Sequence, residues 1–103
     1  MSQVCRFTVP ASRDIEGIVD YIAENSGFDA AERFLSQINA QCRRLAQFPK
    51  MGRRRDELVP SLRSFPFQIY LIFYREIEGG VEIARIISGY RDLEALFFNQ
   101  DED

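Results

Sequence analysis

Arginine supplies nearly all of the positive charge in this chain, because 12 of its 13 basic residues are Arg and only Lys50 is not. The guanidinium is a planar fork of donors that pairs bidentately with carboxylate or phosphate. Several arginines stand where they could meet such a group: the run Arg53, Arg54 and Arg55, and the separate residues Arg63, Arg85 and Arg91. We expect these residues to bind an acidic partner, and a solvated loop or structural ion pairs are the alternatives.

Residue type excludes several other kinds of site chemistry. The sequence has no histidine, so Ser-His and Cys-His catalysis lack their base. Its two cysteines, Cys5 and Cys42, are too few for the usual four-ligand zinc site. Both fit the apolar patterns described below, so we expect buried, free thiols. The sequence therefore predicts neither a metal nor a cofactor.

The chain has the size of one domain, at 103 residues. Its apolar content of 46% is ordinary for a globular protein, and its net charge of -3 gives no overall attraction to nucleic acid. We expect one domain over residues 1–98 and an acidic tail over residues 99–103. No stretch approaches the roughly 20 apolar residues of a membrane helix, and the first residues lack the layout of a signal peptide. We therefore expect a cytoplasmic protein with no membrane partner.

The first half of the chain predicts a strand followed by two helices. Alternation over residues 4–9 puts three side chains on one face of a strand, namely Cys5, Phe7 and Val9. Residues 11–25 carry an amphipathic helical stripe of Ile15, Ile18, Val19 and Ile22. Residues 28–47 predict a second helix with a seam of Ala31, Leu35, Ile38, Cys42 and Leu45, and with Phe34 beside it. The short link around Gly27 makes the two helices an antiparallel hairpin.

The second half predicts a basic loop over residues 50–56 and then strands. Pro66, inside the strand 62–67, indicates an edge, a bulge or a break. The apolar run 69–74 is typical of a strand buried on both faces, and a turn at residues 78–80 leads into a returning strand over 81–88. One side of that strand is expected to carry Val81, Ile83, Arg85 and Ile87. Residues 90–98 predict a short terminal helix.

The predicted fold class is therefore α+β. The element order is a strand, a two-helix hairpin, a three-stranded antiparallel meander and a short C-terminal helix. We expect the C-terminal hairpin at the centre of the sheet and the helices across one face. Arg and Tyr side chains are expected on the other face.

Four segments of the chain, in this order and at natural spacing, resemble the RelE/ParE toxin superfamily. They are residues 11–22; residues 31–49 with Gly52-Arg53; Leu62-Arg63-Ser64 with residues 70–75; and the closing pattern Arg85-x-x-x-Gly89-x-Arg91-Asp92-Leu93. The likeness is greater to the ParE branch than to the ribonuclease branch.

This resemblance implies the toxin of a type II toxin–antitoxin module of the plasmid-stabilisation type. Such a toxin would be neutralised by a cognate antitoxin, ParD-like or similar, in a toxin–antitoxin hetero-oligomer. ParE-type toxins act on DNA gyrase and are not known as enzymes in their own right. The alternatives are a RelE-type toxin that cleaves mRNA on the ribosome, and a degenerate toxin that only binds its antitoxin.

RelE-type toxins cleave RNA with Lys and Arg on the sheet and a Tyr near the C-terminus. Here Arg63 and Arg91 match positions in that pattern, and Tyr90 is a conceivable substitute for the missing Tyr. The Arg expected early in the central strand falls on Gln68 or Leu71. A cleavage reaction needs groups that move protons and stabilise charge. We therefore predict no catalytic residues, with Arg63, Arg91 and Tyr90 as the candidates if the chain were a ribonuclease.

The C-terminal Tyr position of the ribonucleases falls on Phe97 or Phe98, which have no proton to give. Adjacent residues on a helix point about 100° apart, so one ring can be buried while the other faces a groove for an antitoxin helix. The residues predicted to bind partners are thus Arg53, Arg54, Arg55, Arg63, Arg85, Arg91, Phe97 and Phe98.

Overall fold

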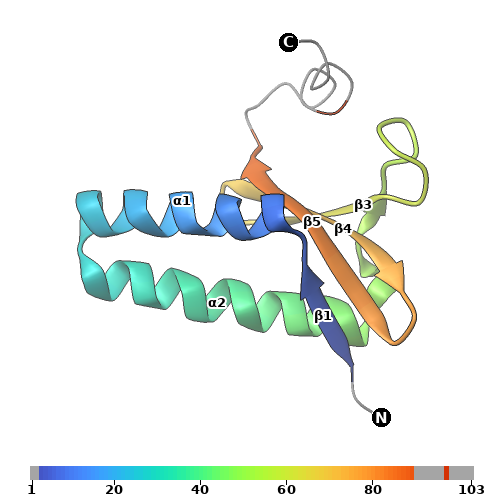
Figure 1. The fold of residues 1–103 in the computed structure, drawn as a ribbon, viewed down its shortest axis with the longest axis horizontal. Coiled ribbons are helices and arrows are strands. Elements are labelled where there is room, and N and C mark those ends of the chain that lie inside the picture. The colour runs from blue at the N-terminus through green and yellow to red at the C-terminus, as the bar shows by residue number, and fades with distance from the viewer. Residues whose placement is uncertain (1–2, 90–96, 98–103) are drawn as a thin grey trace.

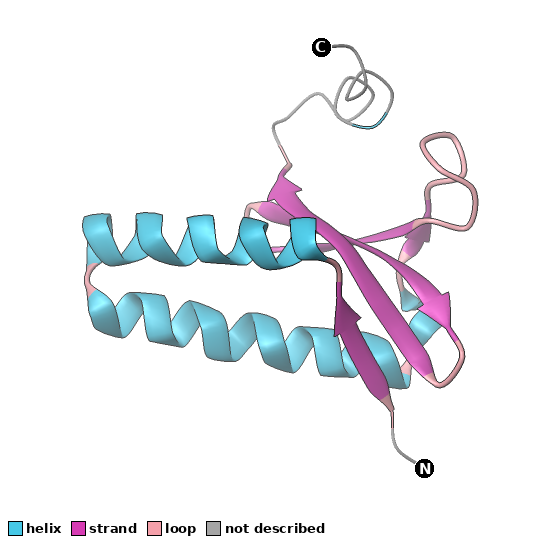
Figure 2. Cartoon of the chain, in the orientation of Figure 1, coloured by secondary structure: helices cyan, strands magenta, loops and turns pink. Residues whose placement is uncertain are grey.

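A computed structural model of the chain describes residues 3–89 and Phe97. Two antiparallel helices lie against one face of a mixed five-stranded sheet with the order β1-β5-β4-β3-β2 (Figures 1 and 2). The predicted α+β class and element order are confirmed over the described residues. The predicted helix at residues 90–98, which carries Tyr90, Arg91 and Phe98, lies outside the described residues except for Phe97. None of the described helices is both long and apolar enough to cross a membrane.

The first strand is shorter than the alternation predicted. β1 spans Val4–Phe7, and α1 already begins at Val9 and runs to Ser26. Thr8 caps α1, since its Oγ1 accepts a hydrogen bond from the Ala11 N–H at 3.1 Å. Pro10 fits the first turn, where a missing N–H costs nothing. The prediction that Val9 continues the inner face of the strand is therefore wrong, and its side chain is exposed.

The helical hairpin agrees closely with its pattern. α2 spans Phe28–Gln47, and Gly27 makes the turn before it with a φ of 96° that favours glycine. One residue of the predicted seam is misplaced: Phe34 is buried where Leu35 was expected, and Leu35 is 38% exposed. The hairpin and the sheet together bury Ala11, Phe34, Ile38, Cys42, Leu45, Ala46, Ile72, Tyr74, Val81, Ile83 and Ile86.

The sheet has five strands, one more than the four predicted, and the extra strand lies in the segment expected to be a basic loop. After the 3-10 turn η1 (Pro49–Met51) comes β2 (Arg53–Arg54), which pairs antiparallel with β3 (Arg63–Phe67). β4 (Tyr70–Ile77) and β5 (Gly80–Ser88) form the long hairpin, and β1 adds to β5 in parallel. Pro66 lies on β3 beyond the two residue pairs that β3 makes with β2, so the structure agrees with the edge among the three alternatives that its position left open.

A β-bulge changes the faces of β5. Phe73 pairs with Arg85 and Tyr74 pairs with Ile83, so Ala84 is an extra residue on β5. Val81 and Ile83 therefore face the helices, whereas Ile87 lies on the opposite face. The prediction that Val81, Ile83, Arg85 and Ile87 share one side is wrong, because one added residue inverts the alternation beyond it.

On the face of the sheet away from the helices, Arg and Tyr side chains were expected, but an apolar cluster covers part of this face. A second cluster of Leu58, Leu62, Phe73 and Ile87 lies there, with Leu71, Ala84 and Phe97 packed against it. Tyr70 and Tyr74 instead point into the helix-side core. The aromatic run of β4 is thus buried on both faces, as its continuous apolar character predicted.

Candidate functional site

The structure divides the predicted partner-binding arginines between two regions of the sheet. Arg85 lies on β5, beside α1. Arg53, Arg54 and Arg63 lie on the paired strands β2 and β3, and Arg55 follows directly after β2. Because β4 stands between β3 and β5, these residues do not form one cluster around an open face. Arg91 lies outside the described residues.

Arg85 is held by Asp14 of α1. Its Nε and Nη2 donate to the two carboxylate oxygens at 2.8 and 3.1 Å, and the Ile86 backbone N–H donates to the same carboxylate at 2.9 Å. Thr8 Oγ1 donates to the Ala84 carbonyl at 2.9 Å. Side chains from the start of α1 thus bind the edge of β5 beyond the end of β1. The hydrogen bond that Arg85 donates to Asp14 raises the pKa of Arg85.

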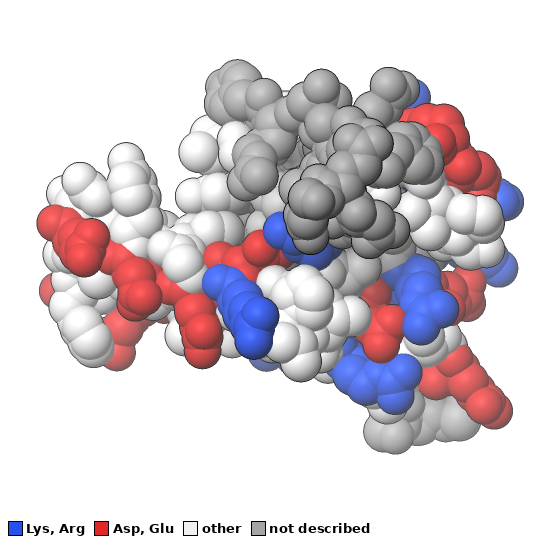
Figure 3. All heavy atoms as spheres, turned by 45° about the horizontal axis from the view of Figure 1, so that its top comes forward, with Lys and Arg blue, Asp and Glu red and all other residues white. Residues whose placement is uncertain are grey.

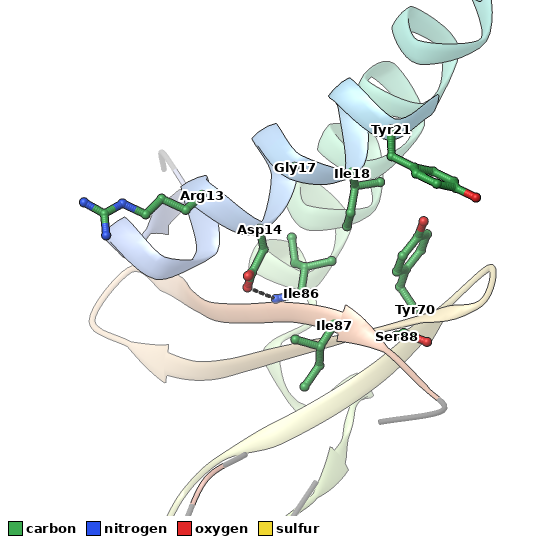
Figure 4. A pocket seen from close by; sticks show the side chains of 9 residues that line it. All are labelled: Arg13, Asp14, Gly17, Ile18, Tyr21, Tyr70, Ile86, Ile87 and Ser88. Carbon is green, nitrogen blue, oxygen red and sulfur yellow. Dashed lines mark hydrogen bonds between the residues drawn. The ribbon is translucent and has the colours of Figure 1, made fainter. Parts of the chain in front are cut away.

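A pocket of about 330 Å³ opens beside this ion pair, between α1 and the sheet (Figure 4). Arg13 and Asp14 lie at one end of it, and the rings of Tyr21 and Tyr70 stand opposite each other at the other end. Burial, and then the neighbouring Tyr21, raise the pKa of Tyr70. Sequence reasoning missed this site, because Asp14 and Tyr21 sit on the polar face of an ordinary amphipathic helix.

The run of three arginines is only partly a solvated loop. Arg53 is exposed, and Arg54 donates from Nε to Asp56 Oδ2 at 2.8 Å. Arg55 turns inward and donates from Nε to Ser64 Oγ at 2.9 Å, so its side chain is only 16% exposed.

Acidic side chains dominate the helical end of the view in Figure 3, whereas most basic ones lie over the sheet and its loops.

Arg63 is positioned by backbone carbonyls. Its Nη1 donates to Gly52 O at 2.8 Å and to Lys50 O at 3.4 Å. Tyr74, a buried residue of the core, holds the same backbone segment, residues 49–52. Its hydroxyl donates to Pro49 O at 2.8 Å and accepts from the Gly52 N–H at 2.7 Å. Arg63 therefore rests on a backbone segment that is itself fixed to the core.

Gln68 and Leu71, the two positions at which the resemblance to RelE-type ribonucleases led us to expect a cation, are neutral here. Leu71 packs in the second apolar cluster, opposite Ile87. Gln68 occupies the turn after β3 and donates to Gln37 at 3.1 Å. Phe97 stacks edge-on against Phe73, with ring centroids 5.1 Å apart. Within the described part of the chain, no group of three or more His, Cys, Asp or Glu side chains could hold a metal.

The family model described as ParE toxin of type II toxin-antitoxin system, parDE, matches residues 5–93. The chain belongs to this ParE toxin family.

Individual relatives agree with that assignment. Toxin ParE3 of Caulobacter vibrioides is 36% identical over 95 residues, which cover 92% of this chain and 94% of the relative. Toxin ParE1 of Mycobacterium tuberculosis is 29% identical over 85 residues, covering 82% of this chain and 87% of the relative. A solved structure titled "Chromosomal ParDE TA system from P. aeruginosa" matches with a TM-score of 0.71 at 23% identity, covering 84% of this chain and 95% of that chain. The last comparison concerns the fold alone.

Proposed function

We propose that this ParE toxin is held inactive by a cognate ParD-like antitoxin in the cytoplasm and that the free toxin inhibits DNA gyrase. The observation that carries the proposal is the family match over residues 5–93, whose description names a type II toxin-antitoxin system, parDE. The predicted target follows from the ParE branch of the superfamily.

The helical hairpin offers a surface suited to an antitoxin helix. An apolar hollow of about 320 Å³ is lined by Val19, Ala23, Ala31 and Leu35, and Phe28 at its edge is 71% exposed. Asp20 and Glu32 also line it. An amphipathic helix binds such a groove through its apolar face, and basic residues flanking that face would pair with the two carboxylates. The exposed Arg53 would pair with an antitoxin carboxylate elsewhere.

The ribonuclease alternative has less support. Leu71 and Gln68 put no charge near a scissile phosphate, and Phe97 has no hydroxyl. Losing a general acid or base typically costs about 10²–10⁴-fold in rate. A toxin that acts by binding its target needs none of these groups.

Expression in cells separates the candidates. Without antitoxin, the toxin should induce the DNA-damage response and filamentous cells while ribosome-bound mRNA stays intact. Coexpression of the antitoxin should abolish both effects. Codon-positioned mRNA cuts without a DNA-damage response would favour the RelE-type activity instead. A chain that binds the antitoxin but has neither effect would be a degenerate toxin.

A further inference from the structure

A second pocket, of about 390 Å³, lies where β2 and β3 meet the turn after α2. It is lined by Lys50, Arg54, Ser61, Arg63 and Glu76, and we call it the basic pocket. Three cations stand against one carboxylate, so its lining carries a net charge of +2. The whole chain is acidic at -3, so this positive charge is local.

Two of the cations are placed side by side by the sheet. Arg54 and Arg63 pair directly across β2 and β3, so their side chains leave the same face at neighbouring positions. Like charges directly opposite each other in a sheet are destabilising. Asp56 compensates Arg54 through the 2.8 Å hydrogen bond. In the part of the chain that the structure describes, Arg63 and Lys50 form no ion pair.

Arg63 is held still without being neutralised. Its bonds go to the carbonyls of Gly52 and Lys50, which fix one nitrogen of the guanidinium and leave its full charge available. Arg85 is the contrast, because Asp14 both fixes it and cancels its charge. The Tyr74 hydroxyl anchors the backbone under Arg63, so the cation is preorganised for an incoming anion.

Ser61 also lines the basic pocket. Its backbone adopts a φ of 67°, which is uncommon for a residue other than glycine, and its N–H donates to Asp56 Oδ1 at 2.9 Å. Asp56 thereby fixes Arg54 and Ser61 together. The hydrogen bond from Arg54, then that from Ser61 and a smaller attraction to Arg63, lower the pKa of Asp56.

We propose that the basic pocket binds a phosphodiester group of a nucleic acid backbone. An ammonium, two guanidinium groups and a hydroxyl supply donors from several directions. A phosphodiester accepts through two charged oxygens on a tetrahedral phosphorus and, more weakly, through two ester oxygens, so donors that converge from several directions can reach it together, whereas the two oxygens of a carboxylate lie in one plane. The single charge of a diester also tolerates Glu76 at the rim better than a dianion would. The site goes beyond the proposed function and does not need gyrase, because it can be measured with nucleic acid alone.

The test is fluorescence anisotropy of labelled duplex DNA and of RNA of the same length, titrated with the purified toxin at several salt concentrations. Arg63→Gln and Lys50→Gln should each raise the Kd about tenfold and reduce the salt slope by about one. Arg33→Gln is the matched control, because it removes an equal charge from an exposed site near the opposite end of α2. It should change the Kd less than about twofold.

Comparing DNA with RNA shows which nucleic acid supplies the phosphodiester. Weaker binding of either one by Arg63→Gln and Lys50→Gln supports the site. Equal losses in all three variants would mean diffuse attraction and would overturn the proposal. So would an absence of binding at low salt, or an acidic peptide that binds through Arg63 and Lys50 while nucleic acid does not. Thermal melts show whether the Arg63 variant is folded. If it is not, Lys50→Gln still tests the proposal, because Lys50 is exposed.

Discussion

The carboxylate of Asp14 on α1 binds both the side chain of Arg85 and the backbone of the residue after it on β5. A helix side chain thereby completes the edge of a central strand where its neighbouring strand has ended. The ion pair is partly buried, with side-chain exposures of 24% for Arg85 and 16% for Asp14. Its main role is thus to join the hairpin to the sheet.

Asp14→Ala should destabilise the fold by about 2–3 kcal/mol, because it leaves a half-buried guanidinium and the Ile86 N–H without their acceptor. Asp14→Asn, which keeps one acceptor oxygen, should cost less. Chemical denaturation of both variants and of Arg85→Ala, combined in a double-mutant cycle, measures the coupling. Additive effects of Asp14→Ala and Arg85→Ala would contradict a direct interaction.

Tyr74→Phe should cost about 1–3 kcal/mol, because the Gly52 N–H and the Pro49 carbonyl lose the hydroxyl that joins them. Gly52→Ala should also destabilise the fold, since a Cβ there would clash with the Tyr74 side chain and the Ser64 carbonyl. Denaturant melts measure both. Wild-type stability in Tyr74→Phe would show that the hydroxyl is not needed.

The same tyrosine predicts a dependence on alkaline pH. Burial is the main cause that raises the pKa of Tyr74 above its ordinary value of 10.0. The folded state therefore keeps its proton where the unfolded state loses it, so this contribution to stability is complete below pH 10 and falls as pH rises through the folded pKa. The fall should be smaller in Tyr74→Phe when both proteins are melted between pH 9 and 11.

Both thiols should be free, and they should react unequally. A hydrogen bond from Cys42 lowers the pKa of the half-buried Cys5, whereas that bond and burial raise the pKa of the fully buried Cys42. Thiol titration should find two groups per chain in the denatured, non-reduced protein. In the native protein Cys5 should alkylate first, as peptide mass spectrometry can establish. Equal rates at the two positions would contradict this.

Phe97→Tyr should not create RNA cleavage. The substitution restores a phenol at the C-terminal position, but Gln68 and Leu71 still provide no cation. Primer extension on a translated message should therefore show no cuts with the variant or with the parent toxin. Codon-positioned cuts with the variant would mean that some other group, with Tyr90 the first candidate, completes the chemistry.

Most of the fold could be predicted because its elements follow strong periodicities. The stripe of α2 and the turn at residues 78–80 are local signals, and apart from Leu35 both agree with the structure. The strand β2 has no such signal in the sequence, because its two exposed arginines have the composition of a loop. Only the pairing with β3 makes this segment a strand. Similarly, the bulge at Ala84 leaves an apolar strand pattern intact while inverting its faces.

The candidate site was less predictable, because an arginine's partner depends on tertiary contacts. Arg63 and Arg85 looked equivalent as basic residues beside apolar strands. In the structure one rests on neutral carbonyls and keeps its charge, and the other is neutralised by a residue 71 positions away. No spacing rule connects Asp14 to Arg85, because the folding of the chain brings the two residues together.

Supercoiling of relaxed plasmid by purified gyrase, with increasing amounts of this toxin, tests the central claim most directly. We predict inhibition that depends on toxin concentration and is reversed by a stoichiometric amount of the cognate antitoxin. Heat-unfolded toxin at equal concentration is the control. Full supercoiling at every concentration of folded toxin, with gyrase in the presence of ATP and DNA, would contradict the account.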